Sequence, residues 1–145
     1  MVTQGVDFAL DIALKALDVA KGPKVNNLLY IIMLKRLIAD LYMIKHDYEA
    51  ANMYLEKAMK IAQNNDMRFM QMLLYHSFAK YNEEMISIYK DNAQEYAQTA
   101  VEMYKSSLKL CQNLMLSAYE NLIRKDLTSF NVACKLKNLT IIIED

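Results

Sequence analysis

The side chains best able to carry acid–base or metal chemistry are few, and they lie apart in the sequence. His46 and His76 are the only histidines. Metal sites need several ligands at spacings that bring them to one face, and no Cys, Asp or Glu lies three or four residues from His76. Glu83 and Glu84 are adjacent, so on a helix they point to different faces and do not form a two-carboxylate pair. The sequence therefore predicts no metal site and no acid–base site.

The two cysteines, Cys111 and Cys134, give no sign of nucleophilic chemistry either. Both lie in apolar helical stretches without a neighbouring histidine that would activate a thiol. Two cysteines do not suggest a disulfide framework, and we expect small buried side chains in a reducing, cytoplasmic compartment. With no glycine-rich loop to hold phosphate, we expect no enzyme and no cofactor.

Composition predicts an all-α protein. The 145 residues include only two glycines and one proline, while helix-forming residues abound. A chain of this length typically forms one domain, so we expect a single helical domain over residues 1–145. Its size allows a well-buried core.

Charge and hydropathy exclude several classes of partner. The 17 basic and 17 acidic residues cancel, which argues against binding to nucleic acid. The longest uncharged apolar run, residues 28–34, is far too short to span a membrane. Asp7, Asp11 and Asp18 interrupt the first apolar stretch, so it does not resemble a secretion signal.

The most informative stretch is residues 32–65, which predicts two helices joined by a tight corner at Lys45–Asp47. Asp47 is placed to cap the second helix. One face of that helix is expected to carry small side chains, which let a neighbouring helix approach closely. The residues on this face follow at steps of four, three and four: Ala51, Leu55, Ala58 and Ala62.

These residues also follow a known repeat pattern. Successive positions of the tetratricopeptide pattern are matched by Ile38, Ala39, Tyr42, Ala51, Leu55 and Ala58. The corner His-Asp-Tyr-Glu-Ala-Ala is similar to the corner common in that family, whereas Lys35 and Gln63 stand where the pattern prefers Trp and Pro. Residues 32–65 thus resemble a tetratricopeptide repeat, and a generic antiparallel helix pair is the alternative. The resemblance implies stacked antiparallel hairpins, about six or seven helices in a right-handed array.

The other helices are predicted from periodicity and from breaks such as Gly22-Pro23 and residues 90–92. A seam of apolar and small residues begins at Ala93, and its helix either breaks near Gln112-Asn113 or continues to about Arg124. We expect the last corner at Lys125-Asp126. The predicted helices cover residues 3–20, 24–44, 48–63, 67–89, 93 onward and 127–142.

The function indicated is that of an adaptor that binds a peptide or helix of another protein. Eleven Met and ten Tyr are unusually many for this length. We expect most of the Met side chains, such as Met70, Met85 and Met103, to be ordinary core, while both residue types also suit contacts with partners. In the repeat family, first helices line a concave groove. The candidate groove residues are Met33, Arg36, Asp40, Met43, Ile44, Gln71, Tyr75, Phe78 and Asn82. Asp40 speaks against a ligand that ends in a carboxylate.

Two alternatives remain open. The first helix is apolar almost all round, so it either packs deeply under its neighbour or also meets a second copy, giving a self-assembling homodimer through residues 3–20. A small secretion chaperone built from three such repeats would also fit the length, although not the irregular repeat spacing.

Overall fold

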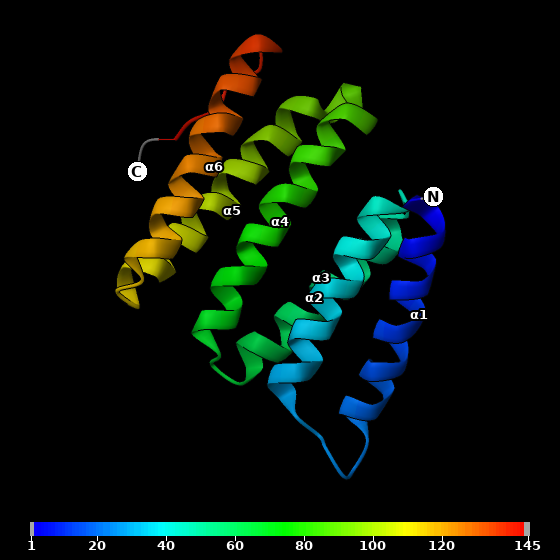
Figure 1. The fold of residues 1–145 in the computed structure, drawn as a ribbon. Helices are drawn as coiled ribbons and strands as arrows, with labels where there is room; N and C mark the ends of the chain where they lie inside the picture. The colour runs from blue at the N-terminus through cyan, green and yellow to red at the C-terminus, as the bar shows by residue number, and fades with distance from the viewer. Residues whose placement is uncertain (1, 144–145) are drawn as a thin grey trace. The chain divides into compact units, whose positions relative to one another are not determined.

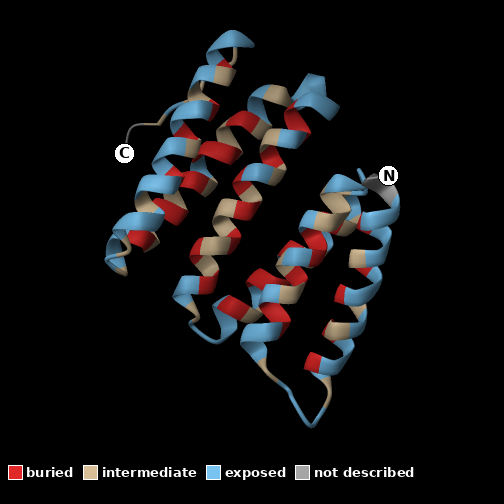
Figure 2. Cartoon of the chain, viewed as in Figure 1, coloured by how far each residue is buried: buried red, intermediate tan, exposed pale blue. Residues whose placement is uncertain are grey.

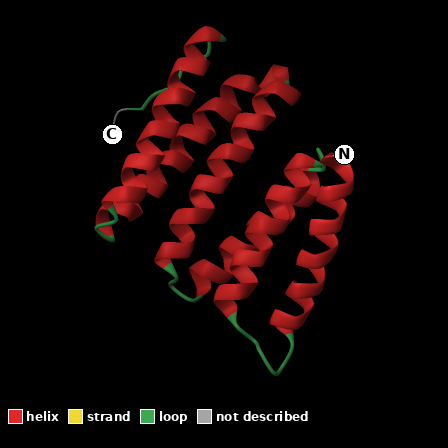
Figure 3. Ribbon diagram, viewed as in Figure 1, coloured by secondary structure: helices red, strands yellow, loops and turns green. Residues whose placement is uncertain are grey.

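The computed structural model describes residues 2–143, and these residues form six α-helices and one short 3-10 turn (Figure 1). No strand occurs within residues 2–143, so the prediction of an all-α fold built from helical hairpins is confirmed (Figure 3). The elements are α1 Val2–Lys21, α2 Leu28–Ile44, α3 Tyr48–Asn64, α4 Arg68–Ile88, η1 Lys90–Asn92, α5 Ala93–Asn113 and α6 Ser117–Leu136. The right-handed stacking of the hairpins stays a prediction.

The chain divides into two compact units, and the boundary follows Met70 in the first turn of α4. The first unit contains α1, α2 and α3. The second contains most of α4, together with α5, α6 and the residues after α6. Each unit is described by itself below.

Two helices, α2 and α3, begin with a side-chain cap, whereas α5 and α6 begin without one. The Asn27 side chain accepts a hydrogen bond from the Tyr30 N–H at 3.1 Å and caps α2, and Asp47 caps α3 through the Ala50 N–H at 3.2 Å. The predicted cap at Asp47 is therefore confirmed. The predicted start of α2 at residue 24 is wrong, because Gly22 to Asn27 form a loop in which Asn26 has a φ of 38°.

Helix ends use one motif repeatedly. Within residues 2–143, four helices end with a residue in the left-handed conformation, followed by an N–H that bonds five residues back. For α5, the Met115 N–H bonds the Gln112 carbonyl at 3.1 Å and the Leu116 N–H bonds the Cys111 carbonyl at 2.9 Å. This motif usually holds glycine at the left-handed position. Here the positions carry His46, Asp66, Met115 and Asn138, with φ between 49° and 61°.

This motif corrects two predictions. The seam that begins at Ala93 breaks at Asn113, so α6 starts at Ser117, and Lys125-Asp126 lies inside α6 rather than at a corner. The predicted last helix over residues 127–142 is also wrong, since α6 ends at Leu136 and the left-handed Asn138 turns the chain back. Of the two alternatives for the helix that begins at Ala93, the break near Gln112-Asn113 is therefore confirmed, whereas apolar spacing concealed the turn at Asn138.

The buried residues of the first unit, which are red in Figure 2, have mostly aliphatic and small side chains. The inner face of α1 packs on Ile31 and Ile38 of α2. The predicted inner face of α3 is confirmed, because Ala51, Leu55 and Ala58 are buried. Small side chains on both elements let α2 and α3 approach closely.

The core of the second unit is centred on an aromatic side chain, Tyr104 of α5, which is fully buried. Its ring lies 5.9 Å from the His76 ring of α4 and 6.1 Å from the Phe130 ring of α6, measured between centroids. Leu139 and Ile141, which follow α6, pack against the same core. The second unit is thus held by three helices and a non-helical segment.

Candidate functional site

The predicted groove residues of α2 lie on its outer side. Met33 and Ile44 are 51% and 53% exposed, Asp40 is exposed, and Arg36 and Met43 are partly buried. Helical geometry places positions 33, 37, 40 and 44 on one face. The structure thus brings these side chains to one surface of the first unit.

Sequence reasoning missed two members of this surface. Tyr30 and Leu37 are 55% and 47% exposed and lie beside Met33 on the outer side of α2. We call the surface formed by Tyr30, Met33, Leu37 and Ile44 the α2 face. Ile32, Ile38 and Ala39 on the opposite side are fully buried, so comparing the two sides of α2 would have identified Tyr30 and Leu37.

The predicted groove residues of α4 belong to the second unit. Gln71, Tyr75 and Phe78 are partly buried. Asn82 is buried, and its amide donates a 2.8 Å hydrogen bond to the Phe78 carbonyl of its own helix. Asn82 therefore supports α4 locally and offers little to a partner.

The first helix has two apolar sides. Leu10, Ala13 and Leu17 are buried against α2, while Phe8 and Val19 on the other side are 69% and 65% exposed. The expectation that α1 is apolar most of the way round is confirmed, and its outer side presents large apolar side chains to solvent.

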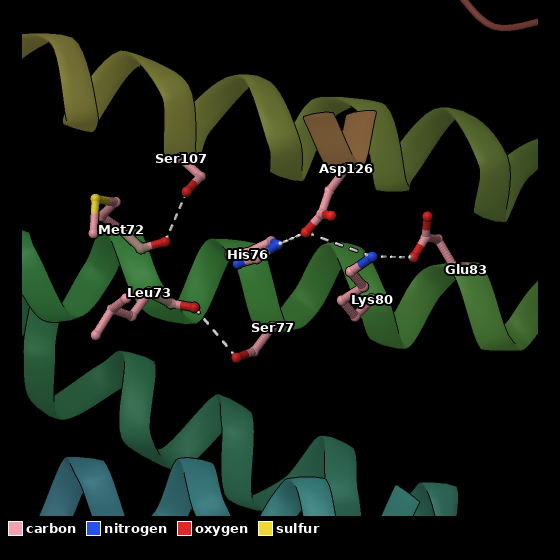
Figure 4. Close-up of polar contacts among 8 residues, drawn as sticks. All are labelled: Met72, Leu73, His76, Ser77, Lys80, Glu83, Ser107 and Asp126. Atoms are coloured by element: carbon pink, nitrogen blue, oxygen red, sulfur yellow. Dashed lines mark hydrogen bonds and ion pairs between the residues drawn. The ribbon is translucent and has the colours of Figure 1, made fainter. Parts of the chain in front are cut away.

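A polar cluster joins α4 to α6 in the second unit (Figure 4). The His76 Nε2 lies 2.8 Å from the Asp126 Oδ2, and the Lys80 Nζ lies 3.7 Å from the same oxygen. Lys80 also approaches Glu83 at 3.4 Å. The four side chains are polar partners of one another, although His76 and Asp126 lie 50 residues apart in the sequence. The cluster therefore links α4 to α6.

The hydroxyls near this cluster are engaged elsewhere. Ser77 donates to the Leu73 carbonyl at 3.2 Å, and Ser107 donates to the Met72 carbonyl at 2.8 Å (Figure 4). A histidine–aspartate pair activates a nucleophile only when a hydroxyl or thiol lies within hydrogen-bond reach. Both serine hydroxyls donate to backbone carbonyls, which favours a structural role for the cluster.

Burial sets the protonation of the groups around Tyr104. Burial raises the pKa of the Glu83 carboxyl, and Lys80 opposes that shift only in part. Burial, followed by the nearby Glu83 carboxylate, strongly raises the pKa of the Tyr104 hydroxyl. That hydroxyl has no hydrogen bond of normal geometry among the described residues. Tyr104 therefore stays protonated at neutral pH.

The thiols show the same influence of burial. Cys111 and Cys134 are both buried, and burial raises the pKa of each thiol. Reactive cysteines need a lowered pKa and some exposure.

Among the described residues, no three His, Cys, Asp or Glu side chains are grouped so that they could hold a metal ion. None of the described helices combines the length and apolar character needed to cross a membrane.

A basic pocket of about 450 Å³ lies at one end of the first unit. Its deepest cation, Lys35, is only 4% exposed, and its Nζ lies 5.5 Å from the centre of the Tyr54 ring. Burial first, and then the charges of Lys21 and Lys57, lower the pKa of Lys35. The residues lining the pocket are Lys21, Ile31, Lys35, Lys57, Lys60, Ile61 and Asn64.

Comparisons of the chain with protein-family models, with curated proteins and with solved structures gave no match. The likeness to a tetratricopeptide repeat therefore depends on the hairpin residues themselves, and functional reasoning depends on the surfaces described above.

Proposed function

We propose that this chain is a protein-interaction module similar to tetratricopeptide repeats, and that the α2 face binds an apolar segment of a partner protein. The observation that carries the proposal is the two-sided character of α2. Its inner side fills the core of the first unit, while its outer side exposes four large apolar side chains in helical register. Aligned exposed apolar residues of this kind commonly mark protein-binding surfaces.

The residue types on the α2 face suit such a role. Tyr30 offers a rigid apolar body with a hydrogen-bonding tip, and Met33 can adapt its flexible side chain to different contours. Leu37 and Ile44 extend the apolar strip toward the end of the helix. In the repeat family that the hairpin resembles, first helices likewise line the surface that holds a peptide or helix.

The chemistry of the rest of the chain supports binding over catalysis. The His76–Asp126 pair serves to join helices, and the two thiols are buried with raised pKa. The equal numbers of acidic and basic residues provide no general attraction for nucleic acid. These observations favour an adaptor that binds another protein over an enzyme.

The test begins with affinity purification on the immobilised chain, followed by identification of the bound protein and its recombinant production. Equilibrium binding is then measured with a Met33→Glu, Leu37→Glu double variant. Placing two carboxylates in the apolar contact should weaken binding by about tenfold or more. Circular dichroism melts would show that the variant folds.

A matched control carries the same change elsewhere. Leu122 and Val132 of α6 are 49% and 54% exposed, so Leu122→Glu with Val132→Glu adds the same charges at similar exposure. This variant should bind the partner as tightly as the wild type. Equal weakening in both variants would show that charge alone, and not the α2 face, determines the affinity.

The exposed side of α1 favours a second candidate, self-assembly through the first helix. Phe8, Ile12 and Val19 lie on one face and are all more than half exposed. Light scattering at rising concentration should then show a dimer that Ile12→Glu abolishes. A monomer at high concentration would eliminate this candidate and leave the α2 face untouched.

A further inference from the structure

The non-helical segment formed by residues 139–143, which we call the return segment, is held by two glutamines of α5. The Thr140 N–H donates to the Gln94 Oε1 at 2.9 Å, and the Gln94 amide nitrogen donates back to the Thr140 carbonyl. The Ile142 N–H donates to the Gln98 Oε1 at 3.0 Å, and the Gln98 amide nitrogen donates back to the Ile142 carbonyl at 3.3 Å. Each glutamine therefore pairs with both backbone groups of one residue.

The spacing of these pairs fits an extended chain. Gln94 and Gln98 are one helical turn apart, and four residues of α-helix rise about 6 Å. Two residues of extended backbone rise about 6.6 Å, so Thr140 and Ile142 meet successive turns. The side of α5 thus provides the paired donors and acceptors that a neighbouring strand would provide.

The side chains of the return segment alternate between the core and solvent. Leu139, Ile141 and Ile143 pack against the core of the second unit, while Thr140 and Ile142 are exposed. Recognition consequently combines backbone pairing at every second residue with apolar packing at the residues between. Extended peptides are recognised in this way when they add to a sheet edge, and the pattern depends little on the exposed side chains.

The groove between α5 and α6 continues beyond the return segment. A space of about 590 Å³ opens next to Ile143, with Leu108 and Leu127 among its lining residues. Among the described side chains that line it, the charged ones are three cations and one carboxylate: Lys105, Lys109, Arg124 and Glu102. The return segment therefore fills only the first part of a longer groove. Arg124 is paired with Glu120 at 2.8 Å, so Lys105 and Lys109 contribute most of the positive charge of the remainder.

We propose that the α5–α6 groove is a binding site for an extended peptide of another protein, and that the return segment is a resident occupant which this peptide displaces. The peptide carries apolar residues at alternate positions, as Leu139, Ile141 and Ile143 do, followed by acidic residues that enter the basic part of the groove. This site lies in the second unit and does not depend on the α2 face.

The experiment uses a fluorescent peptide with the sequence of residues 137–145, KNLTIIIED, which has the required alternation and an acidic end. Its binding is measured by anisotropy to the full chain and to an Ile141→Ser, Ile143→Ser variant that weakens the resident segment. The variant should bind the peptide at least about tenfold more tightly, because less apolar contact has to be displaced. A Thr140→Pro variant, which removes one backbone donor and keeps the apolar side chains, provides a second way to release the segment.

Three further measurements test the mode of binding. A peptide N-methylated at the amides that correspond to Thr140 and Ile142 keeps every side chain but loses two donors, so its affinity should fall about tenfold. Gln94→Leu with Gln98→Leu, added to the released variant, should cause a similar loss, while Gln63→Leu on α3 should cause none. A peptide with its acidic residues replaced by amides should bind more weakly at low salt.

Equal binding of the peptide to the wild type and to both released variants would overturn the proposal. So would unchanged affinity of the N-methylated peptide. If the released chain instead forms dimers by exchanging return segments and binds no peptide, the groove serves a second copy of this chain and the proposal is wrong.

Discussion

The two units of this chain pack their helices with different kinds of side chain. The first uses small side chains, and the second uses a large aromatic ring together with polar pairs. In the first unit, the inner face of α3 is formed largely by small side chains, and Ala51, Ala58 and Ala62 are fully buried. In the second unit, three helices surround Tyr104, and polar contacts such as the His76–Asp126 pair cross the gaps between them. One interface is narrow and apolar, while the other surrounds a bulky side chain and contains polar pairs.

This difference explains why the units should respond differently to mutation. An interface built from alanines has no space for an added side chain, so enlargement should damage it most. A core built around one aromatic ring loses many contacts at once when that ring is removed, so truncation should damage it most. The predictions below use this contrast, beginning with the largest expected effect.

Truncation at the centre of the second unit should have the largest effect. Tyr104→Ala should lower the free energy of unfolding by roughly 3–5 kcal/mol, because it removes a fully buried ring. Tyr104→Phe is the matched control. It keeps the ring and removes a buried hydroxyl without a hydrogen bond among the described residues, so stability should be unchanged or slightly higher. Urea unfolding measures both, and a large loss in Tyr104→Phe would reveal a hydrogen bond that the structure does not show.

Enlargement in the first unit should have the next largest effect. Ala58→Leu should destabilise the chain by about 1–3 kcal/mol, because position 58 is fully buried and has no space for the added carbons. Ala118→Leu, at an exposed position of α6, should change stability by less than about 0.5 kcal/mol. If Ala58→Leu is tolerated as well as Ala118→Leu, the small side chain at position 58 is not needed for packing.

Removing the buried cation of the first unit should stabilise it. Lys35→Met keeps the length of the side chain and removes a charge that burial and two other lysines disfavour, so we expect a gain of about 1 kcal/mol at neutral pH. Thermal melts of both proteins at several pH values measure the gain. Lys24→Met, at an exposed position of the first unit outside the pocket, is the control.

The gain from Lys35→Met should depend on pH in a defined direction. The pKa of Lys35 in the folded chain is below its ordinary value of 10.5, so between these values the unfolded chain binds more protons. The stability of the wild type relative to Lys35→Met therefore rises with pH in that window. The gain should shrink as pH approaches 10.5, and a gain that grows with pH would contradict this account.

The smallest effect concerns the left-handed corner before α6. Met115 has a φ of 57° and is 89% exposed, so its side chain contributes little packing while its backbone is disfavoured. Met115→Gly should stabilise the chain by up to about 1 kcal/mol. Asn138→Gly should gain less, since asparagine tolerates this conformation better. Equal losses in both would show that the side chains at these corners matter more than the backbone.

The extent to which sequence predicted the structure follows the same contrast between units. The small-residue face of α3 follows from helical periodicity, and the cap at Asp47 follows from the residue type just before the helix. Both signals are local, so the sequence predicted both features. The contact between His76 and Asp126 joins positions 50 residues apart, and no local sequence pattern predicts it. The turn at Met115 was left as one of two alternatives, because methionine is an unusual residue for a left-handed position and apolar spacing continues across it.

The candidate sites show the same limit. Met33 and Ile44 were predicted from the resemblance to a repeat family whose first helices line a groove, and the structure places both on the outer side of α2. The glutamine pairs at Gln94 and Gln98 were invisible in the sequence, because they depend on a segment that was predicted to be helical. Only the turn at Asn138 makes its backbone available to α5.

The central claim, that the α2 face binds the partner protein, can be tested directly by methyl NMR of the labelled methionines. Met33 lies on the α2 face, and the highly exposed Met115 at the α5–α6 turn serves as an internal control. On adding the purified partner, the account predicts that the Met33 signal shifts or broadens while the Met115 signal stays in place. A Met33 signal that stays unchanged under saturating partner would contradict it.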